Sequence, residues 1–251
     1  NTEGSLYLAE LGEKGEMTGS RVLVPLRGCA EARAFDLEGD GDQDILAVFA
    51  SGQQDLWALV NDGAGNFTPQ ILIQRRPSWG FNGVEIADLD GDGNQDLIMY
   101  AGNNLEMLDP PVRSYHGLHF FKGDGKGNFE EQPQAFIYMP GAIVVRTGDW
   151  NLDGKVDLVA GALVPDWRTD SAVGAITVRN LGEFRFEARM LTHAPVISIE
   201  SADVDSDGDL DLFLGLAPYI AVEHPQEERA RAQAVINSSP ALHFFRNQAK
   251  H

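Results

Sequence analysis

The chain has 251 residues, of which 43% are hydrophobic, enough for the core of one large domain or two small ones. Its 38 acidic and 19 basic side chains give a formal net charge of −19, which excludes nucleic acid as a partner because phosphates would be repelled. No apolar run is long enough for a membrane span, so we expect no transmembrane segment. The chain begins at Asn1 without a visible signal peptide, and we expect a mature or trimmed product.

Residues 1–29 contain two strand-like segments, at 5–11 and 20–26, and the only cysteine, Cys29. A single cysteine cannot form a disulfide within the chain or attach haem through a two-cysteine motif. The two segments are similar to the third and fourth strands of the repeat that follows them. We therefore expect residues 1–29 to supply strands of a closing or preceding repeat unit.

A nine-residue pattern, D-x-[D/N/E]-x-D-G-x-x-D, occurs four times, each time followed by a hydrophobic run. The first aspartates of the four copies are Asp36, Asp88, Asp149 and Asp203. Behind each copy lies a second strand-like segment, such as "LHFFKGDGKGNF" from Leu118. Behind the first three copies lies a third segment, such as "QPQAFIYM". Four copies with identical glycine placement indicate an internal structural repeat.

Each repeat predicts four short antiparallel strands, which in the second copy cover residues 83–89, 96–102, 117–123 and 133–139. Four-stranded units repeated roughly every 50–60 residues are typical of a β-propeller, in which neighbouring blades bury each other's faces. We expect an all-β fold and a single propeller domain over residues 1–251, with units of approximately 30–76, 77–139, 140–194 and 195–247. The one segment with helical character begins at Pro225 and predicts a short surface helix.

The repeated acidic loops have the chemistry of calcium sites. Oxygen ligands at alternate positions of a tight loop turn toward one centre, glycine permits the turn, and hard oxygen ligands suit Ca²⁺ better than zinc. We expect side-chain ligands at positions one, three, five and nine, and a backbone carbonyl at position seven. By loop, the predicted ligands are Asp36, Glu38, Asp40, Asp42 and Asp44; Asp88, Asp90, Asp92, Asn94 and Asp96; Asp149, Asn151, Asp153, Lys155 and Asp157; Asp203, Asp205, Asp207, Asp209 and Asp211. The sequence thus predicts up to four structural Ca²⁺ ions.

Two alternatives compete with this interpretation. The EF-hand loop shares the beginning of the pattern, but it ends with glutamate at position twelve and lies between helices. Here the last acid is at position nine and strand-like runs lie on both sides, so we reject an EF-hand. The other alternative is a set of acidic turns that bind no metal. The third loop is the weakest candidate, because it has three carboxylates instead of four and Lys155 adds a positive charge.

The repeat resembles the FG-GAP or VCBS repeat, which is found in the integrin α-subunit propeller and in many secreted bacterial proteins. The acidic loops carry the resemblance, together with the segments "YHGLHFFKGDGKGNF", "YMPGAIVVRTGDWNLDGKVDLVAG" and "ALVPDWR". The resemblance covers nearly the whole chain and implies a β-propeller with Ca²⁺ between the first and second strands of each blade. It also implies a secreted, extracellular or periplasmic protein that acts in adhesion, recognition or scaffolding.

The number of blades stays open. Propellers of this kind often have seven blades, whereas this chain has four calcium units, of which the last lacks a fourth strand. Either the strand at 20–26 completes the fourth unit and closes a ring, or the chain is part of a longer propeller. The additional strand at 5–11 favours the second alternative.

Long loops on the face opposite the acidic loops form the predicted binding surface. In a four-stranded meander, the loops between the second and third strands lie on that face, and three of them are long and chemically varied. Exposed aromatic and arginine side chains suit a protein interface or a sugar, and equally suit packing of the loops. The predicted partner-binding residues are Trp79, Asp109, Arg113, Tyr115, His116, Asp166, Trp167, Arg168, Tyr219 and His224.

We expect an extracytoplasmic, calcium-stabilised module that binds protein or carbohydrate partners or serves as a scaffold. The sequence has no nucleophile elbow, zinc triad or phosphate loop, so we expect no enzyme and name no catalytic residue. Two alternatives remain, a subunit of a larger membrane-associated or redox assembly and a polysaccharide-active enzyme of the lyase or hydrolase type. A pocket of convergent polar residues would favour the enzyme, and an apolar patch would favour the subunit.

Overall fold

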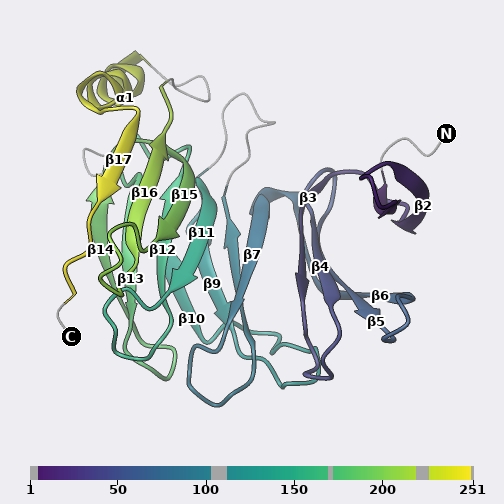
Figure 1. Ribbon diagram of the computed structural model, residues 1–251. Helices are drawn as coiled ribbons and strands as arrows, with labels where there is room; N and C mark the ends of the chain where they lie inside the picture. The colour runs from purple at the N-terminus through teal and green to yellow at the C-terminus, as the bar shows by residue number, and fades with distance from the viewer. Residues whose placement is uncertain (1–4, 103–111, 169–171, 219–225, 250–251) are drawn as a thin grey trace. The chain divides into compact units, whose positions relative to one another are not determined.

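The computed structural model describes residues 5–102, 112–168, 172–218 and 226–249. Within these residues the chain forms 17 strands, one α-helix and one short 3-10 helix, and every strand pair is antiparallel (Figure 1). The all-β prediction is confirmed. The chain divides into two compact units, Asn1–Pro77 with Gly125–Asn128 and Ser78–Asp124 with Phe129–His251.

The first unit contains a two-stranded and a four-stranded sheet. The N-terminal hairpin pairs β1 (Leu6–Leu11) with β2 (Met17–Val24). The larger sheet follows chain order through β3 (Cys29–Phe35), β4 (Asp44–Phe49), β5 (Gln54–Asn61) and β6 (Phe67–Arg75). Val24 of β2 packs in one apolar cluster with Ala47, Phe49 and Leu59, so the hairpin shares the core of this sheet.

The second unit contains three sheets whose strands also follow chain order. The first sheet consists of β7 (Phe81–Ala87), β8 (Asp96–Ala101), β9 (Gly117–Phe121) and β10 (Ala135–Tyr138), and a 3-10 helix, η1 (Pro77–Trp79), precedes it. The second consists of β11 (Ala142–Gly148), β12 (Asp157–Ala162), β13 (Ala175–Asn180) and β14 (Phe186–Thr192). The third consists of β15 (Val196–Ala202), β16 (Asp211–Leu216) and β17 (Leu242–Phe245), with helix α1 (Gln226–Ser238) between the last two strands.

Successive sheets of the second unit pack through their first strands, because β11 contacts both β7 and β15. One apolar cluster includes Ile98, Phe120 and Val145, and another includes Val159, Ile199 and Leu214. All six residues of β8 and of β12 are buried. A strand that is apolar on both faces needs a neighbour on each side, which explains why a continuous hydrophobic run follows the acidic loops.

The predicted repeat is confirmed as a strand meander in all four copies, with three strands in the last copy among the described residues. The four copies also share an irregularity in strand pairing that the sequence did not indicate. In each sheet the register shifts near the start of the first strand, between Cys29 and Glu31 in the first copy. The predicted helix is confirmed as α1, although it starts at Gln226 and continues to Ser238. The only helices of the described residues are α1 and η1, and neither is long and apolar enough to cross a membrane.

Candidate metal centre

Each acidic loop joins the first and second strands of a sheet, at 36–44, 88–96, 149–157 and 203–211. The glycine at the sixth position has a positive φ in all four loops, between 82° and 95°. A Cβ atom at Gly41, Gly93 or Gly154 would meet nothing within 4 Å, so backbone conformation and not crowding requires glycine there. The sharp turn that the sequence predicts at this position is confirmed.

The fourth position of each loop also has a positive φ. Gly39 and Gly91 occupy it in the first two loops, but Leu152 and Ser206 occupy it in the others, with φ values of 57° and 61°. An L-residue with a Cβ atom is strained in this conformation, and leucine has no polar side chain to compensate. The third and fourth loops therefore keep the shared backbone geometry although it strains the conformation of Leu152 and Ser206.

The first aspartate of each loop caps the turn. In the second loop, Oδ1 of Asp88 accepts the N–H of Gly91 at 2.7 Å, and Oδ2 accepts the N–H of Gly93 at 3.0 Å. The other three first aspartates likewise accept N–H groups from the fourth to sixth positions of their own loops. Both carboxylate oxygens take part, so this residue holds the loop conformation from within.

The ninth aspartate fastens its loop to the third strand of the same sheet. Asp96 is fully buried, and its Oδ2 accepts the N–H of Leu89 while its Oδ1 accepts the N–H of Gly123, both at 2.9 Å. Burial raises the pKa of Asp96, although these two hydrogen bonds act against the rise. The backbone N–H groups of Asn61, Asn180 and Asn247 bind the equivalent aspartates Asp44, Asp157 and Asp211. We call this arrangement the clasp; the sequence indicated only a metal ligand at this position.

Side-chain oxygens of the loops converge as a cation site requires. One oxygen each of Asp88, Asp90 and Asp96 lie within 4.8 Å of one another, and the same holds for Asp203, Asp205 and Asp207. Ligand oxygens on opposite sides of a Ca²⁺ ion are about 5 Å apart, since each lies at roughly 2.3–2.6 Å from the ion. The spacing of these carboxylates therefore fits calcium.

Two carboxylate oxygens of the loops are buried without a partner among the described residues. They are Oδ1 of Asp42 and Oδ1 of Asp209, both at the seventh position. Burial, together with the neighbouring carboxylates, raises the pKa of Asp42 and that of Asp209. The sequence assigned only backbone carbonyls to this position, whereas these two buried Oδ1 atoms add two oxygen donors. Unpaired buried oxygens beside like charges are unfavourable without a cation, so the donor set fits Ca²⁺.

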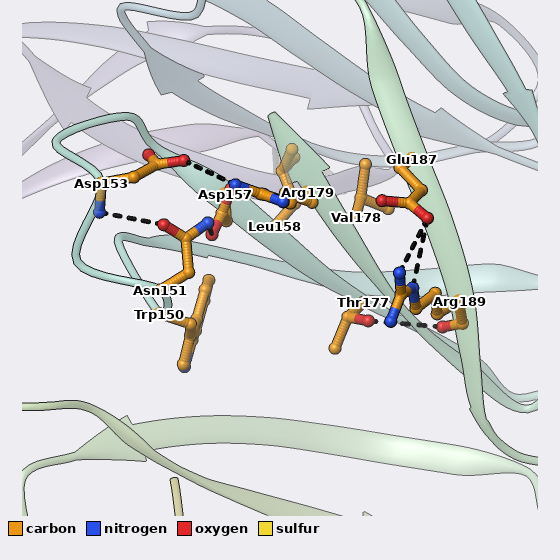
Figure 2. Close-up of a pocket in the computed structure, with 10 residues that line it drawn as sticks. All are labelled: Trp150, Asn151, Asp153, Asp157, Leu158, Thr177, Val178, Arg179, Glu187 and Arg189. Atoms are coloured by element: carbon orange, nitrogen blue, oxygen red, sulfur yellow. Dashed lines mark hydrogen bonds and ion pairs between the residues drawn. The ribbon is translucent and has the colours of Figure 1, made fainter. Parts of the chain in front are cut away.

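The third loop carries its own positive charges and lines a pocket of about 430 Å³ with β13 and β14 (Figure 2). Figure 2 shows the guanidinium of Arg179 directed at Asp153, at 3.4 Å, and Nζ of Lys155 lies 3.7 Å from the same oxygen. The side-chain amide of Asn151 donates to Asp157 at 2.8 Å. Burial acts to raise the pKa of Asp153, but the N–H of Lys155 and the Arg179 guanidinium outweigh it and lower that pKa.

Basic side chains also reach the second and fourth loops. Nζ of Lys122 donates to Oδ2 of Asp92 at 2.7 Å and also contacts Asp90. These contacts raise the pKa of Lys122 and lower the pKa of Asp92. Arg246 forms an ion pair with Asp205 of the fourth loop. Sequence reasoning missed these residues, although a basic residue at the end of the third strand or directly after it, in three of four copies, was a visible signal.

Four of the predicted partner-binding residues come together near the first sheet of the second unit. Trp79 stacks on Tyr115 with ring centroids 4.8 Å apart, and the Tyr115 hydroxyl lies 2.9 Å from Oγ of Ser78. His116 is buried, and its Nδ1 accepts the N–H of Arg113 at 3.3 Å. The ring proton is therefore on Nε2, which donates it to the Ser78 carbonyl at 3.0 Å. Burial lowers the pKa of His116. His116 thus holds the loop, while Trp79 and Tyr115 are half-buried.

Asp166, Trp167 and Arg168 form a second group. The guanidinium of Arg168 makes two hydrogen bonds of 2.7 Å to the carboxylate of Asp166 and is itself exposed. Trp167 is 3% exposed and packs with Ala172 and with Ala232 of α1, so it anchors its loop. The remaining predicted partner-binding residues, Asp109, Tyr219 and His224, lie outside the described residues.

Comparison with known proteins gives one family. The family model of the FG-GAP-like repeat matches residues 4–99, which include the first two acidic loops. Among solved structures, the V. cholerae biofilm matrix protein Bap1 is similar, with 18% sequence identity and a TM-score of 0.43. That similarity covers 80% of this chain and 26% of the other, so the chain spans about a quarter of that protein's length. No curated protein matches the sequence. Residues 4–99 are thus similar to the FG-GAP-like repeat, and the same loop pattern recurs outside the matched region, at 149–157 and 203–211.

Proposed function

We propose that the chain is a calcium-binding β-propeller module, or part of one, with structural Ca²⁺ in up to four loops. One observation carries the proposal: the same loop geometry recurs, with converging side-chain oxygens in the second and fourth loops and a clasped ninth aspartate in all four. The carboxylates would hold Ca²⁺ as hard oxygen ligands, and their mutual repulsion would then be offset.

The packing of the sheets supports a propeller. Within the second unit, three consecutive meanders pack through β7, β11 and β15, the first strands of each sheet, and bury apolar clusters between them. In a propeller each blade contacts only its neighbours in this way, and the first strand of each blade lies innermost. Among the described residues no strand pairs with the outer side of β17, which agrees with a fourth strand supplied by another part of the ring.

The proposed role is binding or scaffolding outside the cytoplasm, without catalysis. Loops that depend on Ca²⁺ are suited to an extracellular or periplasmic setting, where this ion is plentiful, and extracellular modules bind it with dissociation constants of about 0.1–1 mM. An adhesion or scaffolding role, with a protein or carbohydrate as partner, agrees with the resemblance to the FG-GAP-like repeat.

The partner surface is proposed at the end of the first sheet of the second unit. Tyr138 is 51% exposed and pairs with Gly117, the neighbour of His116. Partial burial raises the pKa of Tyr138, the charge of Asp166 adds to the rise and that of Arg168 acts against it. Asp166 and Arg168 are therefore close enough to Tyr138 to act on it, and both groups of predicted residues border this tyrosine. An exposed tyrosine beside an exposed, pre-organised arginine is a combination typical of contact surfaces.

Metal analysis and thermal unfolding test the calcium proposal. We expect at least three Ca²⁺ per chain after dialysis against millimolar calcium, and a lower melting temperature after EDTA treatment. Each site would stabilise the fold by about 2.7 kcal/mol at a calcium concentration 100 times its dissociation constant. An unchanged melting temperature in EDTA would refute the proposal.

A pull-down from the native source and a glycan array test the partner surface. Arg168→Ser and Tyr138→Ser should each weaken the captured interaction, while Arg185→Ser, which removes an exposed arginine from the turn between β13 and β14, should not. Equal losses in all three variants, or none in the first two, would place the partner elsewhere.

A further inference from the structure

The strand register places one residue of each sheet directly opposite the clasping aspartate. β4 pairs with β5 through Ile45 and Leu59, and one step further Asp44 faces Val60. By the same extension of the printed registers, the ninth aspartates of the other loops, Asp96, Asp157 and Asp211, face Lys122, Arg179 and Arg246. Three loops thus have a basic residue at this position, and the first loop has valine. We call the three basic residues the tethers.

All three tethers contact carboxylates of their own loop. Lys122 binds Oδ2 of both Asp90 and Asp92. Arg179 reaches Oδ2 of Asp153, as Figure 2 shows, and Arg246 pairs with Oδ2 of Asp205. The contacted aspartates occupy the third and fifth positions of their loops. In several of them Oδ1 accepts a backbone N–H group of the same loop, as Asp92 does from Asn94, while Oδ2 contacts the tether. The tether therefore uses the oxygens that remain for a metal ion.

A tether and a divalent cation compete for the same oxygens, because two positive charges at one carboxylate repel each other. An ion that binds there has to displace the ammonium or guanidinium group or share the oxygens with it, and in either case the positive charge stays attached to the sheet nearby. Both effects weaken metal binding. The loops also differ in their own charge: the first and fourth contain five acidic residues, the second four, and the third three together with Lys155.

We propose that Lys122, Arg179 and Arg246 act as built-in competitors of Ca²⁺, so that the four loops fill in a fixed order. The loop at 36–44, with five acids and Val60 opposite the clasp, fills at the lowest calcium concentration. The loop at 149–157, with Arg179, Lys155 and three acids, fills last. The inference rests on the proposed calcium binding and adds which residues set the affinity of each site. In calcium-poor medium the tethers take the place of the ion and keep loops two to four formed.

Calcium titration followed by NMR of the whole chain tests the order. The sixth-position glycines, Gly41, Gly93, Gly154 and Gly208, give one backbone amide signal per loop, and each donates its N–H to the first aspartate. We expect the Gly41 signal to respond first and that of Gly154 last. In Lys122→Val the Gly93 midpoint should fall roughly three- to tenfold, the range expected for one or two half-exposed ion pairs. Lys122→Arg, which keeps the charge, should leave it within about twofold.

The reciprocal variant Val60→Lys should raise the Gly41 midpoint while the other three signals keep theirs. If the four glycines titrate together in the wild type, or if Lys122→Val leaves the Gly93 midpoint unchanged, the competition is refuted while calcium binding stands. If no glycine responds to calcium, the proposed function fails and the inference with it. Amide exchange in EDTA provides a second readout, because Lys122→Val should loosen the metal-free loop at 88–96.

Discussion

The clasp makes a prediction that separates its structural role from metal binding. In Asp96→Ala, the N–H groups of Leu89 and Gly123 lose their acceptor inside the protein, where both hydrogen bonds are buried. A buried unsatisfied donor costs about 1–3 kcal/mol, so two cost roughly 2–6 kcal/mol. Removing one negative charge from the cluster offsets part of this loss. We therefore expect the free energy of opening around this loop to fall by about 2–4 kcal/mol even in EDTA.

Native-state amide hydrogen exchange in EDTA measures this loss. A decrease of about 2–4 kcal/mol corresponds to exchange roughly 30- to 700-fold faster for the amides of β8 and β9. Asp92→Ala is the matched control, since Asp92 belongs to the same loop but its side chain binds Asn94 and Lys122 and not the buried N–H groups of Leu89 and Gly123. It should weaken calcium binding at its own loop and leave exchange in β8 and β9 nearly unchanged in EDTA. Equal exchange in the two variants would show that Asp96 is no more than a metal ligand, and the clasp would be wrong.

Three further predictions concern strain, pH and packing. Leu152→Asn should stabilise the protein by about 0.5–1 kcal/mol in urea unfolding, because asparagine tolerates the positive φ, whereas Leu181→Asn, at a similarly exposed leucine, should not. The pKa of His116 lies below its usual value of 6.5, so at acidic pH the folded protein binds fewer protons than the unfolded chain. The stability that this histidine contributes should be fully present above about pH 6.5 and should fall as the pH drops toward the pKa of the folded state. The melting temperature measured against pH should show this decrease in the wild type, and His116→Gln should lack it. Trp167→Ala should lower the free energy of unfolding by about 3–5 kcal/mol and increase amide exchange in α1, since the indole packs in the apolar cluster with Ala232 of that helix. Unchanged exchange in α1 would contradict the packing role of Trp167.

The repeat, the meander and the positions of the acidic loops follow from the sequence because they depend on local rules. Apolar runs after each D-x-x-x-D-G-x-x-D pattern predict buried strands, and β8 and β12 are indeed buried on both faces. Glycine at the sixth position predicts a turn with positive φ, and Gly41 and Gly93 have it. These features involve residues within about ten positions of one another, so one copy of the pattern carries all the information needed. The closed ring, the blade number and the partner remain predictions.

Only the tertiary structure decided what each carboxylate does. The pattern treats the ninth aspartate as a ligand, but the N–H group that Asp96 binds belongs to Gly123, 27 positions later, and strand pairing alone brings it there. The same pairing places Lys122 beside Asp90 and Val60 opposite Asp44, so four loops that look equivalent in sequence differ in charge. Such differences depend on residues distant in the chain that the sheet register aligns, and a local motif contains no information about its register partner. The sequence by itself therefore determined that four acidic loops with one shared pattern exist, and the fold determined how they differ.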